Sequence, residues 1–477
     1  MRRSGAAFVI GAGVHITKRM QNHGLRRLVA TAAMLAMAAW LCSCGTSTAR
    51  PSADAAAADV ATDTPSPANG CPKVGAKAAG IDHVVVIVQE NHTFDSYFGR
   101  WCTAAPGSNP TCIAGGACCE AAPLTEPSGA TPTVLDDAAN GAYDPNHHAA
   151  CEVAELNGGK MDRFVQGAAC SDPRNFAISP KSTVQPYWNM AEQGALADRY
   201  FQPIAGQSTS NDMYLAVAKE VFLDNAFDPP VTGSHCSLSP TKPSYDGQTT
   251  IADLLRKAGK TVAWYGEGLD VMAAAGQECP DAPAACPMAL PLYPCLYDPG
   301  DVPFLYYTQF AEGFVRDFDK LSADLTAGNL PDVAFVKGLG FRTEHPGQGT
   351  TLTDGIHFVQ AILQAIEQSC YKDNTLILLT WDEGGGYFDH VAPPADSAVD
   401  KQPYGTRVPL LALGHYARQG IVSHVVMEHS SIVKFLEWNY LGHKTGQLGA
   451  RDAVVNNLGS LLDPAMSGVT VPEQSGD

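Results

Sequence analysis

The 477-residue sequence predicts an α/β protein with a mostly parallel central sheet that is covered by helices on both faces. Short apolar runs rich in β-branched residues alternate with longer segments whose apolar residues recur every three or four positions. This is the pattern of buried strands alternating with amphipathic helices. Polar residues directly follow two of the apolar runs, and ligands of open α/β sheets bind at the carboxyl ends of strands. Together these observations predict a functional site at one edge of the sheet.

The first predicted strand lies in the segment 81–99, IDHVVVIVQENHTFDSYFG. Its residues 84–88 are continuously apolar, as expected of a strand that is buried on both faces. Glu90 and Asn91 follow at once, which places a carboxylate and a carboxamide just past a core strand. The aromatic residues that come next recur at helical spacing and predict a short helix packed back on the sheet: Phe94, Tyr97 and Phe98.

The later elements continue the alternation. We expect strands over 261–265, 333–336, 376–379 and 408–413, and helices over 186–200, 251–258, 356–366 and 430–438. Thr250 is a typical helix cap and Gly259 a typical helix terminator. Since no second linker and no repeat interrupts this pattern, residues 71–477 are predicted to form a single domain.

The amino-terminal residues 1–44 are typical of an export signal, because they carry six cationic residues, no acidic residue and an apolar run over 28–41. The run closes on LCSCG, which resembles a bacterial lipobox with Cys44 as the lipidated mature terminus. We therefore expect an exported protein that is lipid-anchored at the bacterial cell envelope and faces the periplasm or the exterior. An uncleaved spanning helix is the alternative, although the run is short for a bilayer. Met20 is an alternative start.

Residues 45–70 contain almost no large apolar side chain and predict a flexible tether. The formal charge of the chain is −18, and removing the six cationic residues of the signal takes it to −24. A surface this acidic argues against nucleic acid as a partner and against electrostatic adhesion to anionic lipid. A negatively charged substrate would therefore need local positive charge, most simply a metal ion.

The cysteines predict disulfides. Two of the 14 belong to the signal, and an even number in the remainder of an exported chain favours pairing, although the connectivity stays open. Cysteine-rich insertions are predicted near 100–122 and near 270–300, with Cys236 close enough in sequence to staple the second. Zinc binding by Cys118 and Cys119 is the rival interpretation, and it is weakened because no spaced cysteine pair or paired histidine lies beside them.

A second acidic pair follows the predicted strand 376–379. Asp382 and Glu383 precede three glycines, which allow the backbone to approach another group closely. If this pair converges with Glu90 and Asn91, the four side chains form an oxygen-rich cage for one divalent cation of unknown identity. An acidic, glycine-rich surface turn is the plainer alternative. The ligand spacing does not fit an EF-hand.

Ser208, in AGQSTSNDMYL, is the candidate nucleophile, as a hydroxyl at a predicted turn before an apolar segment. Serines are common in turns for local hydrogen-bonding reasons alone. No Gly-x-Ser-x-Gly motif is present, which weakens a standard α/β-hydrolase interpretation.

Four segments, in order, resemble the bacterial phosphoesterase family that contains phospholipases C and acid phosphatases: IDHVVVIVQENHTFDSYFG, NGGKMDRFV, AGQSTSND and WDEGGGYFDHVAPP. The later segments YGTRVPLLALG and MEHSSIVKFLEWNY resemble the closing strand and helix of that family. The resemblance covers nearly the whole mature chain. It implies an alkaline-phosphatase-like α/β sandwich and a metal-dependent hydrolase of phosphate esters, of the phospholipase C or acid phosphatase type.

The resemblance also implies roles for single residues. Glu90 and Asn91 match one metal-binding pair of the family, and Asp382 and Glu383 match the second. Ser208 matches the hydroxyl nucleophile, which also contacts the metal.

Two histidines match residues of the family's pocket, His345 in TEHPG and His147 in DPNH, with His148 as an adjacent competitor. The implied mechanism is in-line displacement at phosphorus through a phosphoserine intermediate, with a histidine protonating the leaving alcohol.

The chain departs from the family at two places. His92 and Thr93 stand where the family commonly has Arg and Ser, and Ser210-Asn211-Asp212 stands where it commonly has Pro-Asn-Arg. Losing two cationic side chains is expected to weaken contacts with a phosphate or choline-phosphate head group. The substrate therefore stays open among phosphomonoesters, phosphodiesters and phospholipids, and we expect specificity to differ most at His92.

Two other classes of function stay open. One is a different esterase or a sulfatase-like hydrolase on the same sheet, which is disfavoured because the formylation motif of sulfatases is not evident. The other is a catalytically silent surface lipoprotein that binds an anionic ligand or a partner.

Overall fold

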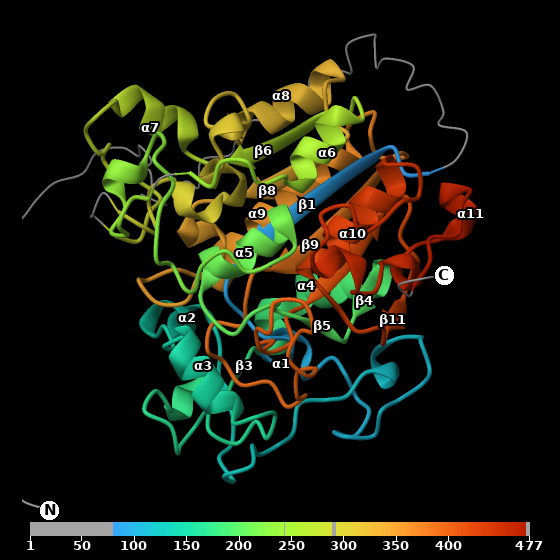
Figure 1. Cartoon of the computed structure of the whole chain (residues 1–477). Coiled ribbons are helices and arrows are strands. Elements are labelled where there is room, and N and C mark those ends of the chain that lie inside the picture. The colour runs from blue at the N-terminus through green and yellow to red at the C-terminus, as the bar shows by residue number, and fades with distance from the viewer. Residues whose placement is uncertain (1–79, 243, 289–291, 474–477) are drawn as a thin grey trace, which may run out of the picture. The chain divides into compact units, whose positions relative to one another are not determined.

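The computed structural model describes residues 80–473 apart from residues 243 and 289–291 (Figure 1). The predicted signal with Cys44 and the predicted tether lie outside the described residues. The described part belongs to one compact unit. None of its helices is both long enough and apolar enough to span a bilayer.

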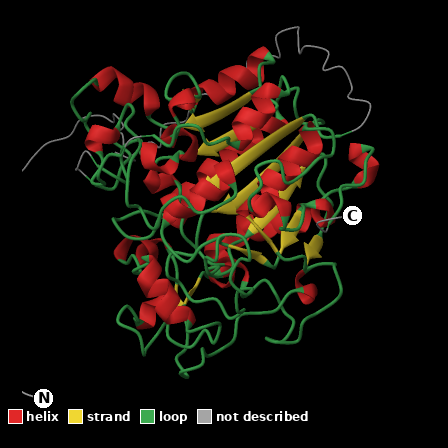
Figure 2. Ribbon diagram, in the orientation of Figure 1, coloured by secondary structure: helices red, strands yellow, loops and turns green. Residues whose placement is uncertain are grey.

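An eight-stranded sheet forms the centre of this unit, in the order β11-β4-β10-β9-β1-β8-β6-β7 (Figures 1 and 2). Its strands are β1 (His83–Gln89), β4 (Ala195–Ala197), β6 (Val262–Gly266), β7 (Val315–Asp317), β8 (Val333–Lys337), β9 (Thr375–Trp381), β10 (Leu410–Gly414) and β11 (Ile421–Ser423). The neighbouring strands are parallel except where β10 pairs antiparallel with β9 and β4. The prediction of a mostly parallel sheet is confirmed.

Helices cover both faces, and the central strands β1, β8 and β9 are accordingly buried along almost their whole length. One set, in front of the sheet in Figure 1, comprises α5 (Ser208–Val217), α6 (Ile251–Lys257) and α10 (His429–Tyr440). A second set of mutually packed helices comprises α4 (Lys181–Gln193), α8 (Asp319–Ala327) and α9 (Leu352–Glu367).

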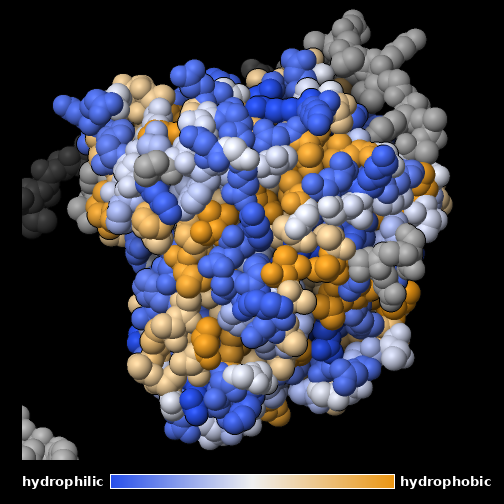
Figure 3. Space-filling model, viewed as in Figure 1, coloured by the Kyte–Doolittle hydropathy of each residue, from blue (hydrophilic) through white to orange (hydrophobic). Residues whose placement is uncertain are grey.

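Shorter elements connect these layers. They are the helices α1 (Phe94–Phe98), α2 (Asp137–Ala142), α3 (Ala149–Leu156), α7 (Leu269–Ala275) and α11 (Pro464–Ser467), and the paired strands β2 (Thr133–Val134) with β3 (Ala177–Ile178) and β5 (Tyr200–Phe201) with β12 (Met427–Glu428). On the face seen in Figure 3, hydrophilic and hydrophobic residues are interspersed, whereas the side chains of the sheet are buried.

Most predicted elements are present, and one was wrong. Thr250 caps α6 as expected. The Thr250 side chain accepts a hydrogen bond from the backbone N–H of Asp253, and the Asp253 carboxylate accepts one from the backbone N–H of Thr250. The helix predicted over 186–200 instead begins at Lys181 and ends before Gly194. Residues 195–197 leave it because they pair with β10 and β11 in the buried sheet, and this pairing outweighs the helical spacing.

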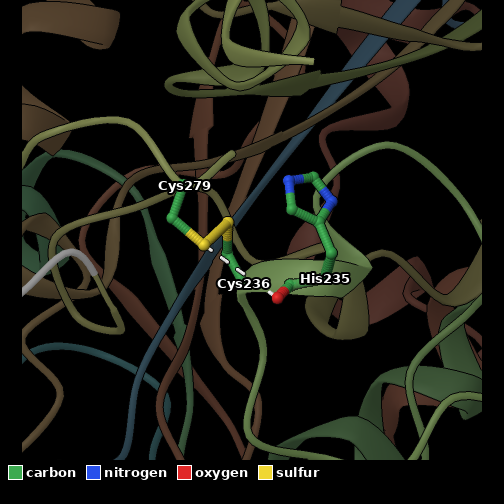
Figure 4. Close-up of side chains that lie close together, drawn as sticks. All are labelled: His235, Cys236 and Cys279. Atoms are coloured by element: carbon green, nitrogen blue, oxygen red, sulfur yellow. Dashed lines mark hydrogen bonds between the residues drawn. A yellow bond between two sulfur atoms is a disulfide. The ribbon is translucent and has the colours of Figure 1, made fainter. Parts of the chain in front are cut away.

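The predicted disulfides are present: Cys102–Cys119, Cys112–Cys118, Cys151–Cys170, Cys236–Cys279 and Cys286–Cys295. The zinc alternative for Cys118 and Cys119 was wrong, because both sulfurs are bonded to other cysteines. Cys236 does staple the second insertion. Figure 4 shows His235 beside that disulfide, and because the two sulfurs are bonded to each other, this group of three potential ligands is not a metal site.

Leu378 tests the contribution of the sheet centre, because it is fully buried and lies opposite Val86 of β1 and Ala412 of β10. Leu378→Ala should lower the free energy of unfolding by about 2 to 5 kcal/mol, through lost burial and a residual cavity. Urea denaturation measures this. Leu238→Ala, at a side chain that is 86% exposed, is the control, and it should change that free energy by less than about 0.5 kcal/mol. Similar losses in the two variants would contradict the assignment of the core.

Candidate active site

The two acidic pairs leave the sheet side by side. Strands β1 and β9 are parallel neighbours with Gln89 opposite Trp381, and the backbone N–H of Asp382 donates to the carbonyl of Gln89 at 3.0 Å. Glu90 and Asp382 therefore start from adjacent strand ends. These two residues, together with Asn91 and Glu383, are almost completely buried.

Three consecutive glycines bring the loop after β9 against the loop after β1. Gly385 has a φ of +66°, and a Cβ atom there would lie 2.2 Å from the carbonyl oxygen of Asn91. At Gly384 a Cβ would lie 2.0 Å from Oγ1 of Thr406. Only glycine permits this approach, so the glycines are required for the two pairs to face one another.

Ser208 joins this group from α5. Its Oγ lies 3.3 Å from Nδ2 of Asn91, and the residue is 2% exposed. The residue does not lie in a turn, as the sequence had suggested, but is the first residue of α5. The N–H of Thr209 in the first turn already donates to Asn225, but the dipole at the start of a helix still favours an anion, so a phosphoryl group on Ser208 would be stabilised there.

Lys337, the last residue of β8, contributes a cation that the sequence analysis missed. Its Nζ lies 2.8 Å from Oε1 of Glu90, 3.2 Å from Oδ2 of Asp212, and 3.6 Å from carboxylate oxygens of both Asp301 and Asp382. Burial opposes the ammonium charge, but these carboxylates raise the pKa of Lys337 well above its ordinary value. Lys337 is a charged residue at the end of an apolar strand. The same pattern in the sequence pointed to Glu90, so it could have identified Lys337 as well.

Tyr293 was also missed. Its hydroxyl donates to Oε2 of Glu90 at 2.5 Å, so that both oxygens of this carboxylate face a donor or a cation. Tyr293 comes from the second cysteine-rich insertion, more than 200 residues from Glu90. Nothing in the local sequence marks that contact.

The donor set fits a divalent cation. Oδ2 of Asp382 and Oε1 of Glu383 are buried and accept no hydrogen bond, and Oε1 of Glu90 faces only the ammonium of Lys337 among the described residues. Burial first, and neighbouring carboxylates next, raise the pKa values of Asp382 and Glu383 well above their ordinary range. Buried carboxylate oxygens without donors are the hard ligands that Mg²⁺, Ca²⁺ or Mn²⁺ prefer, and a cation would offset the cost of ionising them.

His147 and His345 face each other beside this group, with ring centroids 5.9 Å apart. The Nδ1 atom of each lies 2.8 Å from a backbone carbonyl, that of Pro145 and of Pro346 respectively. Because a carbonyl only accepts, Nδ1 carries the proton and Nε2 is left with a free lone pair. Nε2 of His147 lies 3.8 Å from Oε1 of Glu383.

His148 and His92 do not share this position. His148 is exposed and its Nδ1 lies 3.6 Å from the carboxylate of Asp224. His92 is fully buried between the carbonyl of Glu90 and the amide of Asn140, and burial lowers its pKa to about 3. Since the His92 ring has no exposed surface, it can influence specificity only through its neighbours.

Residues 81–441 match the model of the phosphoesterase family. The chain belongs to the phosphoesterase family. It is 24% identical over 410 residues to the non-haemolytic phospholipase C of Pseudomonas aeruginosa, covering 76% of this chain and 54% of that protein. It is 22% identical over 458 residues to non-specific phospholipase C3 of Arabidopsis thaliana, and the match covers 84% of this chain and 77% of that protein. The chain spans about half the length of the bacterial phospholipases C that head the comparison.

Among solved structures, the chain is similar to a protein in the alkaline phosphatase superfamily from Vibrio parahaemolyticus, with 11% identity, a TM-score of 0.34, and coverage of 78% of this chain and 69% of that one. At so low a TM-score the sheet order, rather than the superposition, supports the fold class.

In this chain, a buried ion-pair network holds the two loops of the site together. Nδ1 of His390 lies 2.8 Å from Asp95, which is in the helix after β1, and Nε2 lies 3.3 Å from Glu120. Arg407 pairs with Asp95 at 3.1 Å and with Asp389 at 2.8 Å. Asp95, Asp389 and His390 form a group of potential metal ligands, but Arg407 already pairs with both of its carboxylates.

This network makes stability depend on pH. Burial alone would lower the pKa of His390, but the charge of Asp95 and the hydrogen bonds to Asp95 and Glu120 raise it to about 9. The folded pKa exceeds the ordinary value of about 6.5, so the stabilisation is complete below pH 6.5 and is lost as pH rises through 9, by on the order of 3 kcal/mol. Urea denaturation across this range should show that loss in the native chain and a flatter profile in His390→Gln. Parallel profiles would refute the assignment.

Proposed function

We propose that this chain is a metal-dependent hydrolase of phosphate esters with Ser208 as its nucleophile. The observation that carries the proposal is the position of the Ser208 hydroxyl, at the start of α5 and 3.3 Å from Asn91, beside buried carboxylate oxygens that have no donor. The site therefore combines a nucleophile, an anion-stabilising helix end and a cation cage. Phosphoryl transfer requires mainly positioning and charge stabilisation, which these groups supply.

Glu90, Asn91, Asp382 and Glu383, together with Ser208, would hold one divalent ion. When bound, such an ion lowers the pKa of a neighbouring hydroxyl and offsets negative charge on a phosphate oxygen. The unpaired oxygens of the cage support this assignment.

The protein side chains carry the bond changes. The hydroxyl of Ser208 gives up its proton to solvent water, and Oγ attacks phosphorus in line with the leaving alcohol, which forms a phosphoserine and breaks the ester bond. Nε2 of His345, once it has taken up a proton on its free lone pair, gives that proton to the leaving oxygen, and Nδ1 stays bound to the Pro346 carbonyl. Water then attacks the phosphoserine and gives one proton to Nε2, the bond between phosphorus and Oγ breaks, the phosphate leaves, and Oγ regains a proton from solvent. His147, whose pKa burial lowers, is the second candidate for accepting that proton.

Phosphomonoesters, phosphodiesters and phospholipids are the proposed substrate classes. Relatives named phospholipase C support the last two. Asp212, which stands where the family commonly has Arg, is paired with Lys337 and does not repel a phosphate as a free carboxylate would.

Ser208→Ala should abolish hydrolysis, because the attacking oxygen is removed, with a fall in kcat on the order of 1,000-fold or more. The assay uses p-nitrophenyl phosphate, bis(p-nitrophenyl) phosphate and phosphatidylcholine, from acidic to alkaline pH, with Mg²⁺, Ca²⁺, Mn²⁺ or Zn²⁺ supplied. Ser423→Ala is the matched control, since Ser423 is a buried hydroxyl on the edge strand β11 that bonds Ser460. Unchanged hydrolysis in Ser208→Ala would disprove the nucleophile. Absence of hydrolysis in the native chain under every condition would favour a binding lipoprotein.

We also propose that the protein is exported and anchored through a lipid on Cys44. The apolar run followed by LCSCG supports this, together with the low-complexity segment that separates it from the enzyme. Such an anchor would keep the active site near the envelope surface.

Cys44→Ser should move the protein from the membrane fraction to the soluble fraction and abolish incorporation of a labelled fatty acid, because the acceptor thiol is lost. Cell fractionation and metabolic labelling measure the two effects. Cys42→Ser is the control and should keep both. If Cys44→Ser stays labelled and membrane-bound, the lipid anchor at this position is ruled out.

A further inference from the structure

Lys337 is linked to four structural elements at once. Its ammonium pairs with Glu90 after β1, Asp212 in α5, Asp301 in a short 3-10 helix (Pro299–Asp301) and Asp382 after β9. The Lys337 side chain is 3% exposed, so water cannot compete for these contacts. Each of these acidic side chains is within 3.6 Å of the same atom.

One of the four contacts reaches the helix of the nucleophile. Ser208 and Asp212 are four residues apart in α5 and therefore lie on the same face of that helix, one turn from each other. Lys337 bonds Asp212 at 3.2 Å and Glu90 at 2.8 Å. The ammonium thus connects the helix that carries Ser208 to the first half of the carboxylate cage.

The charges around Lys337 are not balanced. An ammonium has three N–H groups, and here it serves four carboxylates. Oδ1 of Asp212 and Oδ2 of Asp382 are buried and lack a hydrogen-bond donor. A single fixed positive charge is thus set within an excess of negative charge, close to where an anionic ester would enter.

We propose that Lys337 is a positioning residue, which ties the helix of Ser208 to the cage and reduces the negative charge that an anionic phosphate ester meets. The inference rests on the proposed function of the same site. It predicts a change in binding affinities that would not occur if Lys337 only stabilised the fold. Removing this positive charge favours a divalent cation in the cage and disfavours a phosphate ester, so the two affinities move in opposite directions.

Three variants separate the charge of Lys337 from its tethering contact. Lys337→Met removes both, Lys337→Arg keeps the charge, and Lys337→Met combined with Asp212→Asn removes the contact while leaving the net charge of the native chain. Lys434→Met is the matched control, because Lys434 is an equally buried lysine in α10 whose Nζ reaches the carbonyl of Ala453. Circular dichroism checks folding, and the loss of the free Mn²⁺ signal in electron paramagnetic resonance measures Mn²⁺ binding without any assay of activity.

We expect Lys337→Met to bind Mn²⁺ on the order of tenfold more tightly, and to lose about 100-fold in kcat/KM for p-nitrophenyl phosphate. The double variant should bind Mn²⁺ as the native chain does, yet retain a lowered kcat because Ser208 is no longer tethered. Lys337→Arg should recover most of the activity. Lys434→Met should change neither quantity.

The proposal is overturned if Lys337→Met loses Mn²⁺ affinity together with activity while Lys434→Met keeps both, since Lys337 would then be only structural. Unchanged kcat/KM in Lys337→Met also overturns it. Should Lys337→Met fail to fold, the double variant and Lys337→Arg decide the question, because neither leaves Asp212 without compensation. If the native chain hydrolyses no phosphate ester, the proposed function fails, and the Mn²⁺ shifts still decide the role of the charge.

Discussion

Burial of several carboxylates at one edge of the sheet is the constraint on which the site depends. Glu90, Asp212, Asp382 and Glu383 have almost no exposed surface, and an ionised carboxylate in such surroundings is costly unless a cation or hydrogen bonds compensate it. Lys337 compensates part of this charge, and a divalent cation fits the remainder. The cluster is therefore unfavourable for folding by itself, and a bound cation would offset part of that cost.

The chain holds this cluster in place through contacts between the loop after β1 and the loop after β9. Gly385 lets the second loop lie against the carbonyl of Asn91, and Arg407 and His390 pair with Asp95 behind the site. These contacts join segments almost 300 residues apart in sequence. The cage therefore depends on the parallel pairing of β1 with β9, which brings both loops to the same edge.

Sequence alone was informative where a feature is local. The apolar run before Glu90 and that before Asp382 identified two adjacent strand ends, because parallel strands place their carboxyl ends at one edge. The start of α5 at Ser208 was missed, since SerThrSerAsn is equally compatible with a turn. Tyr293 was missed because its contact with Glu90 depends on how a disulfide-bonded insertion folds over the sheet. Such contacts are properties of the tertiary structure, and no spacing encodes them.

The position of His345 shows how the same packing could serve proton transfer. The preceding residue, Glu344, has a φ of +74°, a conformation that costs a non-glycine residue about 1 kcal/mol or more. Its buried carboxylate accepts from Tyr97 at 2.5 Å, from Trp381 at 3.1 Å and from Tyr187. These three donors hold the backbone in its unfavourable conformation. The His345 ring is thereby placed by the contacts of its neighbour, and its Nε2 needs no structural partner and stays free for a proton.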